Sequence, residues 1–420
     1  MGLDLQTYIY GVHQSVATYN SQWLEQQLTI NPPSETAAAI ASFPDPSEID
    51  LYLLPDKFKP LIRSYIKLMK SIHVHRAIDT AFENFLAFMS DFNRVAEVTS
   101  NWICLALINS SNELLSLHQV RSASKDKAEN DASLEKVGVV INRSFKICLT
   151  DKSVEPATSK KSCIHFFLAA LIKIYFKLDH LELARSMEKA LLGTNSMIPT
   201  IQYCPVDYRK HVVTYLYYSS LLSLDDGEFS FAELKLQTAL QFLSCYKKIP
   251  RVRPHIEKIL MLLIPLTYFL KGMSPSNEIY DQYPHLKLVY KENILKAIKE
   301  GNVLSFEAAV QKLHKIFLNR HIYILIVKLK YLCYLSLFKK TALYYKSFTQ
   351  ENPHIIPFSY LQRALKMSKD DQEEVPVEEV ECILANLIVQ RRVKGYLSHT
   401  NKCIVLSKTE AFPKPSVAAT

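Results

Sequence analysis

Pairs of helix-forming segments joined by short polar turns recur along the chain from Cys163 onward. In each segment the apolar residues return every three or four positions, which is the period of an amphipathic helix. The first two turns lie 47 residues apart, from Asp179 to Asp226, so the repeat is looser than a strict tetratricopeptide repeat. The pattern predicts stacked, TPR-like helical hairpins that form a right-handed solenoid. The three pairs are residues 163–178 with 182–192, 212–224 with 229–246, and 294–298 with 306–318.

The composition favours an all-α fold. Only 8 of the 420 residues are glycine, whereas Leu, Ile, Ala, Lys and Glu, which favour helices, dominate the segments between prolines. An apolar fraction of 48% supplies ample material for a core. Two apolar runs, 259–270 and 322–338, contain Pro265 and the pair Lys328 and Lys330, so neither offers about 20 uncharged apolar residues. We expect no membrane insertion.

The segment before the hairpins is less regular. Its helical patterns alternate with a loop that is rich in Ala, Ser and Pro and ends near Pro46. Two polar stretches, 121–136 and 151–161, each predict an exposed linker or a long loop. We therefore divide the chain into an N-terminal helical region with linkers (1–160), a helical-repeat part (161–350) and a C-terminal part (351–415).

The C-terminal part has the element order of a winged helix. Three helices precede a two-stranded hairpin that turns at Thr400-Asn401-Lys402. The third helix is expected to carry Glu378 and Glu379 in its first turn, and Arg391 and Arg392 in its last turn, which complements the helix dipole. The predicted elements are helices at 335–348, 358–367 and 377–392, an acidic loop at 369–376, and strands at 393–399 and 403–408.

Recognisable catalytic motifs are lacking, so we predict no catalytic residue, metal or cofactor. His73 and His75 stand two positions apart, which in a helix directs them to different faces, and no third ligand follows at useful spacing. Cys163 and His165 suggest a nucleophile with its base, against the alternative of a buried thiol beside a structural histidine. The eight cysteines are scattered singly without a C-x-x-C pair, which indicates free thiols in a reducing compartment.

Positive charge is concentrated toward the C-terminus. Residues 241–420 hold 27 Lys and Arg against 15 Asp and Glu, whereas residues 1–240 hold 23 against 26. This asymmetry favours a polyanion partner, and solvated helix faces are the alternative explanation.

Seven cations are the candidate nucleic-acid-binding residues. Arg391, Arg392, Lys394 and Lys402 are predicted to share one small surface, because the last helix runs directly into the hairpin. Phosphate-backbone binding requires such a cluster and no particular base sequence, while contact with a partner protein is the alternative use of this surface. Lys408 is expected to flank it. Further candidates are Lys339 and Lys340, whose alternative role is compensation of a helix C-terminus.

Several short runs of the sequence resemble one branch of the PCI-domain family. That branch holds COP9 signalosome subunit 12, PCI domain-containing protein 2 and the PCI subunit of the nuclear-pore transcription-export complex. The similarity covers roughly residues 200–415. The runs are 300–302 (EGN), 327–330 (VKLK), 337–340 (LFKK), 381–388 (ECILANLI), 393–399 (VKGYLSH) and 405–408 (VLSK), with Phe412-Pro413.

The resemblance implies a helical-repeat stack capped by a winged helix, and a non-catalytic scaffold subunit. The implied partners are a second PCI protein of the SAC/GANP type, the small acidic protein shared with the proteasome lid, and RNA or DNA. Transcription elongation, mRNA maturation with splicing, and nuclear mRNA export are the implied processes, so we expect a nuclear location, with the cytoplasm as an additional one. The alternative is a purely structural subunit of a COP9-signalosome-like or proteasome-lid-like complex, with COP9 signalosome subunits as partners.

Overall fold

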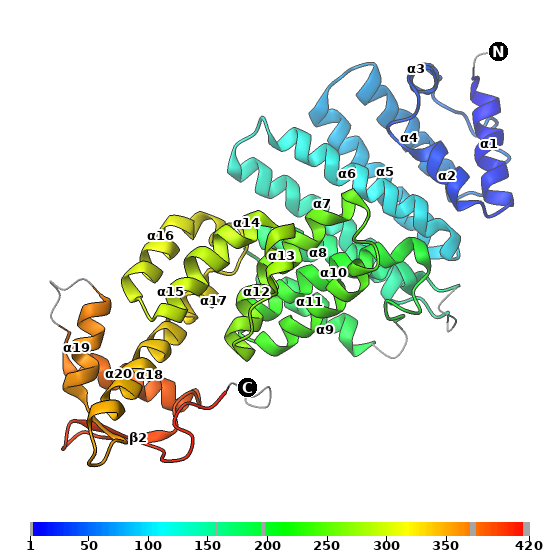
Figure 1. Ribbon diagram of the computed structural model, residues 1–420. Coiled ribbons are helices and arrows are strands. Elements are labelled where there is room, and N and C mark those ends of the chain that lie inside the picture. The colour runs from blue at the N-terminus through cyan, green and yellow to red at the C-terminus, as the bar shows by residue number, and fades with distance from the viewer. Residues whose placement is uncertain (1–2, 154, 156–157, 195–197, 370–374, 415–420) are drawn as a thin grey trace. The chain divides into compact units, whose positions relative to one another are not determined.

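The computed structural model describes residues 3–153, 155, 158–194, 198–369 and 375–414, and helices dominate this described part (Figure 1). The all-α prediction is confirmed, and the only sheet among the described residues is a small one that belongs to the predicted winged helix. The chain divides into two compact units, Met1–Leu222 and Ser223–Thr420. The helix α10 (Val206–Asp225) spans the boundary between them.

The first unit is built from helices that pack mainly against their neighbours in sequence, with Tyr65, Phe85, Phe88 and Phe167 fully buried among them. Its elements before α10 are α1 (Leu5–Ala17), α2 (Ser21–Leu28), α3 (Ser34–Ser42), α4 (Phe58–His73), α5 (Ile78–Val98), the 3₁₀ helix η1 (Asn101–Ile103), α6 (Cys104–Ser122), α7 (Lys127–Leu149), the 3₁₀ helix η2 (Lys160–Cys163), α8 (Ile164–Leu178) and α9 (Leu181–Gly193).

The polar stretch 121–136 is not a linker, and that prediction is wrong. α6 ends and α7 begins within it, and the side chain of Asp126 caps α7 by accepting a hydrogen bond from the backbone N–H of Glu129 at 2.9 Å. Arg121 is buried, donates hydrogen bonds to Asp79 and Glu129 at 2.7 Å, and lies 5.1 Å from the ring centre of Phe82. A polar composition does not distinguish an exposed linker from the ends of two helices, and here the charged side chains cap α7 and form an ion-pair network.

The second predicted linker, 151–161, holds no α-helix among its described residues, but its end is buried. Lys160 is 6% exposed, and its Nζ donates hydrogen bonds to the carbonyl oxygens of Ala96 and Thr99 at 2.8 and 2.9 Å. These carbonyls lie at the C-terminus of α5, where backbone acceptors lack partners within the helix. The lysine therefore closes α5 and attaches the following segment to it.

The second unit continues with helices and ends in the winged helix. The helices of all three predicted pairs are present, the first pair as α8 and α9 of the first unit, and Ala232 and Ala239 of α11 are fully buried. Its elements after α10 are α11 (Phe229–Ser244), the 3₁₀ helix η4 (Pro250–Val252), α12 (Arg253–Lys271), α13 (Asn277–Gln282), α14 (Pro284–Leu286), the π-helix η5 (Lys287–Ile294), α15 (Leu295–Glu300), α16 (Val303–Asn319), α17 (Tyr323–Lys328), α18 (Lys330–Phe348), β1 (Ile355–Pro357), α19 (Phe358–Ser368), α20 (Val377–Val389), β2 (Gly395–Ser398) and β3 (Cys403–Leu406).

The turn between α15 and α16 lies directly against α18. Gly301 has a φ of +69°, and the side chain of Asn302 caps α16 by accepting from the backbone N–H of Ser305 at 2.9 Å. Ser368, the last residue of α19, donates from its hydroxyl to the carbonyl of Gly301 at 2.7 Å and accepts from the N–H of Val303 at 2.8 Å. The turn thus connects the helical repeats to two helices of the winged helix.

The winged-helix prediction is confirmed, with one strand that the sequence did not reveal. The sheet has the order β1-β3-β2, and both pairs are antiparallel. The missed strand β1 pairs with β3 from Ile355 opposite Val405 to Pro357 opposite Cys403. Three residues that end in proline are too few to show the alternation by which a strand is recognised.

Two further expectations about the winged helix are wrong. α20 ends at Val389, and Arg391 has a φ of +55°, so Arg391 and Arg392 lie beyond the helix and do not occupy its last turn. α18 runs from Lys330 to Phe348, so Lys339 and Lys340 lie in its middle. Residues 370–374 of the predicted acidic loop lie outside the described residues.

The two compact units differ from the three predicted regions. The predicted boundary after residue 160 falls inside the first unit, where α7 packs against α8 and the thiols of Cys148 and Cys163 lie 3.6 Å apart. The boundary after residue 350 falls inside the second unit, where α18 packs against both α15 and α19. Among the described residues, no helix combines the length and hydropathy needed to cross a membrane.

Gly301→Ala should destabilise the second unit more than Gly227→Ala does. Both glycines have positive φ angles, +69° and +78°, and alanine pays a cost of about 1–2 kcal/mol in that region. A Cβ at position 301 would also lie 2.9 Å from the backbone N and Cα of Leu337, whereas nothing lies within 4 Å at position 227. We expect Gly301→Ala to cost about 2–4 kcal/mol in total, measured by denaturant unfolding. Equal losses in the two variants would contradict the close contact.

Candidate nucleic-acid interface

The sheet separates the wing cations into two groups. Gly395 faces Leu406 at one end of the β2–β3 hairpin, and Ser398 faces Cys403 at the other. Lys394 and Lys408 flank the first end, whereas Lys402 lies in the turn at the second end with a φ of +48°. The strands have four residues each, so the two ends are three residue steps, or about 10 Å, apart. Arg391 is exposed and leads into the first end.

Arg392 was predicted to contact nucleic acid, but in the structure it contacts Phe269. Its guanidinium donates a hydrogen bond to the carbonyl oxygen of Phe269 at 2.5 Å, and lies 5.1 Å from the centre of the Phe269 ring. Burial lowers the pKa of this guanidinium below its usual value. Phe269 belongs to the last turns of α12, so Arg392 fastens the winged helix to the helical repeats and is not directed at an external phosphate.

Lys394 is exposed but has an anionic partner. Its Nζ lies 2.7 Å from a carboxylate oxygen of Glu410, and both side chains are about half exposed, at 54% and 55%. An exposed pair of this kind contributes little to stability, about 0–1 kcal/mol. It does reduce the positive potential that Lys394 presents to an anion at this end of the hairpin.

The two cations of α18 also differ from each other. The Nζ of Lys340 donates to the carbonyl oxygen of Glu300 at 3.0 Å, which caps the C-terminus of α15. Lys339 is exposed. The structure therefore brings together Arg391, Lys394 and Lys408, and places Lys402, Arg392 and the α18 lysines elsewhere in the second unit.

The exposed face of α20 is not basic. In a winged helix this third helix is the one that enters the major groove of DNA. Its exposed residues are Glu378, Cys382, Ala385 and Val389, and the carboxylate of Glu381 lies 2.9 Å from Nδ1 of His399. A face with acidic and neutral side chains does not attract a phosphate backbone.

An exposed aromatic cluster on α18 and α19 was missed by the sequence analysis. Tyr344, Phe348 and Tyr360 are 70%, 50% and 42% exposed, and Tyr345 completes the cluster. The rings meet in pairs, with centres 5.2 Å apart for Tyr344 and Phe348 and 4.9 Å apart for Tyr345 and Tyr360. The four-residue spacing of Tyr344 and Phe348 was visible in the sequence, but their meeting with Tyr360 depends on the packing of α18 against α19.

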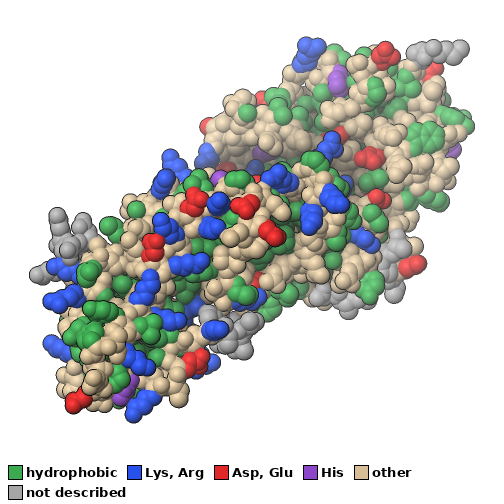
Figure 2. Space-filling view, viewed as in Figure 1, with side chains coloured by type: hydrophobic (Ala, Val, Ile, Leu, Met, Phe, Trp, Pro, Cys, Tyr) green, Lys and Arg blue, Asp and Glu red, His purple; other side chains and the backbone are tan. Residues whose placement is uncertain are grey.

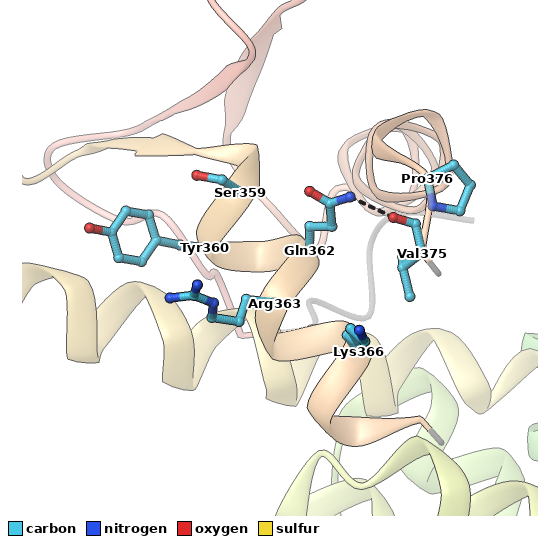
Figure 3. Close-up of a pocket in the computed structure, with 7 residues that line it drawn as sticks. All are labelled: Ser359, Tyr360, Gln362, Arg363, Lys366, Val375 and Pro376. Carbon is cyan, nitrogen blue, oxygen red and sulfur yellow. Dashed lines mark hydrogen bonds between the residues drawn. The ribbon is translucent and has the colours of Figure 1, made fainter. Parts of the chain in front are cut away.

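A groove adjoins this cluster along α19. In Figure 3 the side chains of Tyr360 and Arg363 point to the same side of α19, while the Gln362 amide donates to the carbonyl of Val375 at 2.6 Å. On the face shown in Figure 2, Lys and Arg side chains surround hydrophobic ones near this helix. The groove is lined by Ser359, Tyr360, Gln362, Arg363, Lys366, Val375 and Pro376.

The residues considered for catalysis are arranged as structural groups. Burial raises the pKa of the Cys163 thiol well above its usual value and lowers the pKa of His165 to about 4, so near neutral pH the thiol stays protonated and the imidazole is too weak a base to take its proton. The His165 ring packs 5.2 Å from that of Tyr215. Nε2 of His73 lies 3.3 Å from the carbonyl of Ile30, and no cluster of three or more His, Cys, Asp or Glu within the described residues could hold a metal.

A helical stack that ends in a winged helix is the architecture of a PCI domain, and residues 310–408 match the PCI domain family. Similar proteins were found over nearly the whole chain. The "Protein CSN12 homolog" of Debaryomyces hansenii is 43% identical over 434 aligned residues, which cover 98% of this chain and 99% of the relative. The "PCI domain-containing protein 2" of Danio rerio is 26% identical, with 98% of each chain covered. The "Cop9 signalosome complex subunit 12" of Saccharomyces cerevisiae is 26% identical, covering 82% and 84%.

The chain belongs to the PCI-domain family, in the branch of the CSN12 homologs and PCI domain-containing protein 2. This confirms the resemblance that the C-terminal sequence runs indicated. The matched residues include α18, the sheet and α20, and hence the candidate cations of the winged helix.

Arg392→Ala should destabilise the protein, whereas Arg391→Ala should leave its stability nearly unchanged. The first variant removes a charged hydrogen bond and a cation–π contact with Phe269, which together are worth about 2–4 kcal/mol. The second removes an exposed side chain and should cost about 0.5 kcal/mol or less. Denaturant unfolding of both variants checks this. Equal stabilities would show that Arg392 does not fasten the winged helix to α12.

His165→Phe should reduce the loss of stability of the first unit in acid. The pKa of His165 is about 4 in the folded state and about 6.5 when unfolded, so the unfolded state binds more protons between these values and stability falls as the pH falls. From pH 7.5 to 5 this histidine accounts for about 2 kcal/mol. Thermal unfolding across this range measures the difference, with His75→Phe as the exposed control. His211, whose pKa is also about 4, retains part of the effect in the variant.

Proposed function

We propose that this chain is a non-catalytic scaffold subunit of a PCI-protein complex that binds partner proteins and RNA or DNA. The processes are transcription elongation, mRNA maturation and nuclear mRNA export. Its partners in this proposal are a second PCI protein of the SAC/GANP type and a small acidic protein, and its location is the nucleus, with an additional cytoplasmic pool. The observation that carries the proposal is a PCI winged helix whose hairpin bears exposed cations at both ends.

Exposed apolar side chains in the second unit support the role as a scaffold. Phe231 and Leu234 of α11 are 59% and 61% exposed, and Ile324 and Val327 of α17 are 60% and 43% exposed. Apolar side chains that gather on a helix face remain in contact with water unless another protein covers them. The family relatives include a protein named as a subunit of the Cop9 signalosome, which supports a role within a complex.

Exposed cations support the binding of nucleic acid. Arg391, Lys402 and Lys408 are exposed, and no ion pair holds them among the described residues. Binding through phosphates requires such cations and is independent of base sequence. Because α20 offers no basic face, we expect contact through the hairpin rather than insertion of this helix into a major groove.

Replacement of Arg391, Lys402 and Lys408 by Ala should weaken binding to unrelated RNA sequences by a similar factor. Each lost phosphate contact should reduce the slope of log affinity against log salt by about 0.7–0.9. Glu410→Gln should act in the opposite direction, with about twofold to fivefold tighter binding, because it releases Lys394 from its ion pair. Gel-shift titrations at several salt concentrations, on the protein joined to its PCI partner, measure both effects.

A charge-matched control is available on α15 and α16. Lys299, Lys312 and Lys315 are exposed, and their replacement by Ala removes the same number of charges away from the hairpin. Equal losses of RNA affinity in the two triple variants would show that net charge alone accounts for the effect. Unchanged affinity in the hairpin variant would favour the second candidate function.

That second candidate is a purely structural subunit of a COP9-signalosome-like or proteasome-lid-like complex. Arg392 and Lys340 are bonded to backbone carbonyls within the chain, and Lys394 is paired with Glu410, so part of the predicted cationic surface serves the fold. The name of the Saccharomyces cerevisiae relative also favours it. Affinity purification with mass spectrometry distinguishes the two, because only the first predicts co-purification with mRNA-processing and export proteins.

A further inference from the structure

The aromatic cluster of α18 and α19 has an unusual charge environment. From Lys330 to Lys369 the sequence contains seven Lys and Arg residues and a single acidic residue, Glu351. Two of the seven are engaged at the ends of this segment, since Lys330 pairs with Glu307 and Lys369 with Glu379. Positive charge therefore predominates within this segment, unlike on the neutral and acidic face of α20, whereas the sequence that follows it, residues 370–374, holds four acidic residues.

Two cations lie beside the rings, and no described residue forms an ion pair with them. Arg363 and Lys366 line the α19 groove together with Tyr360, and neither has an ion pair within the described part of the chain. Figure 3 shows the Arg363 guanidinium beside the Tyr360 ring on one side of the helix. A row of rings thus begins at Tyr344, continues through Phe348 to Tyr360, and is followed by the two cations of the groove.

We propose that this surface binds single-stranded nucleic acid, whose bases stack on Tyr344, Phe348 and Tyr360 while its phosphates contact Arg363 and Lys366. Aromatic side chains beside cations are the combination by which proteins hold single strands, because every base has a face that can stack and every nucleotide carries a phosphate. Duplexes do not use such a surface, because their bases are already stacked on one another.

Charge distinguishes nucleic acid from a hydrophobic partner protein, whereas an acidic protein would also pair with the cations and is distinguished by the release of a co-purifying subunit in the test below. A hydrophobic partner protein would leave Arg363 and Lys366 buried without a counter-ion, which is costly. A strand of nucleic acid satisfies both the rings and the cations. The inference rests on the proposed function, because it assumes that the chain meets nucleic acid, but it uses residues that the hairpin site does not.

The test compares a single-stranded RNA with a duplex of the same length, by fluorescence anisotropy on the full-length chain with the subunits that co-purify with it. Tyr344→Ala and Tyr360→Ala should each weaken binding of the single strand about fivefold or more and leave duplex binding within about twofold. Tyr52→Ala, which removes an aromatic ring 69% exposed in the first unit, is the matched control and should change neither. Because Tyr344 is the most exposed ring of the cluster, its loss should not affect folding.

A second variant reports on stacking itself. Tyr360→Trp retains a ring, so it should bind the single strand as well as the parent does, and its added fluorescence should be quenched by the RNA. Heparin, a polyanion without bases, should not quench it. Quenching by heparin, or none by RNA, would overturn the stacking arrangement.

The outcomes separate this inference from the proposed function. If the hairpin variant loses affinity while the aromatic variants do not, the proposed function stands and the inference fails. If the aromatic variants lose single-strand affinity and the hairpin variant does not, the inference stands and the hairpin site fails. If Tyr344→Ala and Tyr360→Ala release a co-purifying subunit and keep their RNA affinity, the surface is a protein interface and the inference is wrong. If the parent binds neither RNA, both fail.

Discussion

The close approach of the Gly301 turn to α18 is the contact on which the arrangement of the second unit depends. Gly301 lacks the Cβ that would meet the backbone of Leu337, so the turn can lie directly on the helix. Lys340 then reaches the carbonyl of Glu300, and Ser368 reaches both Gly301 and Val303. One turn therefore joins the last helical repeat to α18 and α19, and α18 belongs to the repeat stack and to the winged helix at once.

A consequence of this packing is that the cations of the winged helix have two kinds of role. Arg392 and Lys340 are bonded to carbonyl oxygens at or near the ends of other helices, where backbone acceptors lack partners. Arg391, Lys402 and Lys408 extend into solvent. The same excess of positive charge in the sequence thus includes structural contacts and a surface available to an anion, and net charge alone does not distinguish them.

The aromatic cluster also depends on packing, because its rings come from two different helices. Tyr344 and Phe348 share a face of α18, while Tyr360 opens α19 after the short strand β1. The pairing of β1 with β3 sets where α19 starts, and the backbone N–H of Phe358 donates to the carbonyl of Lys402 at 2.8 Å. The position of Tyr360 beside Tyr345 therefore depends on a strand of only three residues, which brings the rings of two helices together.

The sequence by itself determined the helical class, the helix pairs, the order of the winged helix and the family, because helix periodicity, turn residues and short sequence runs are local. It also indicated which segment carries the positive charge. Only the tertiary structure decided that Arg121 and Lys160 are buried within the first unit, that β1 completes the sheet, and that Arg392 faces Phe269. These features depend on partners that lie far away in the chain, 123 residues in the case of Arg392. A long charged side chain has the same local signature whether its end is exposed to water or hydrogen-bonded to a distant carbonyl.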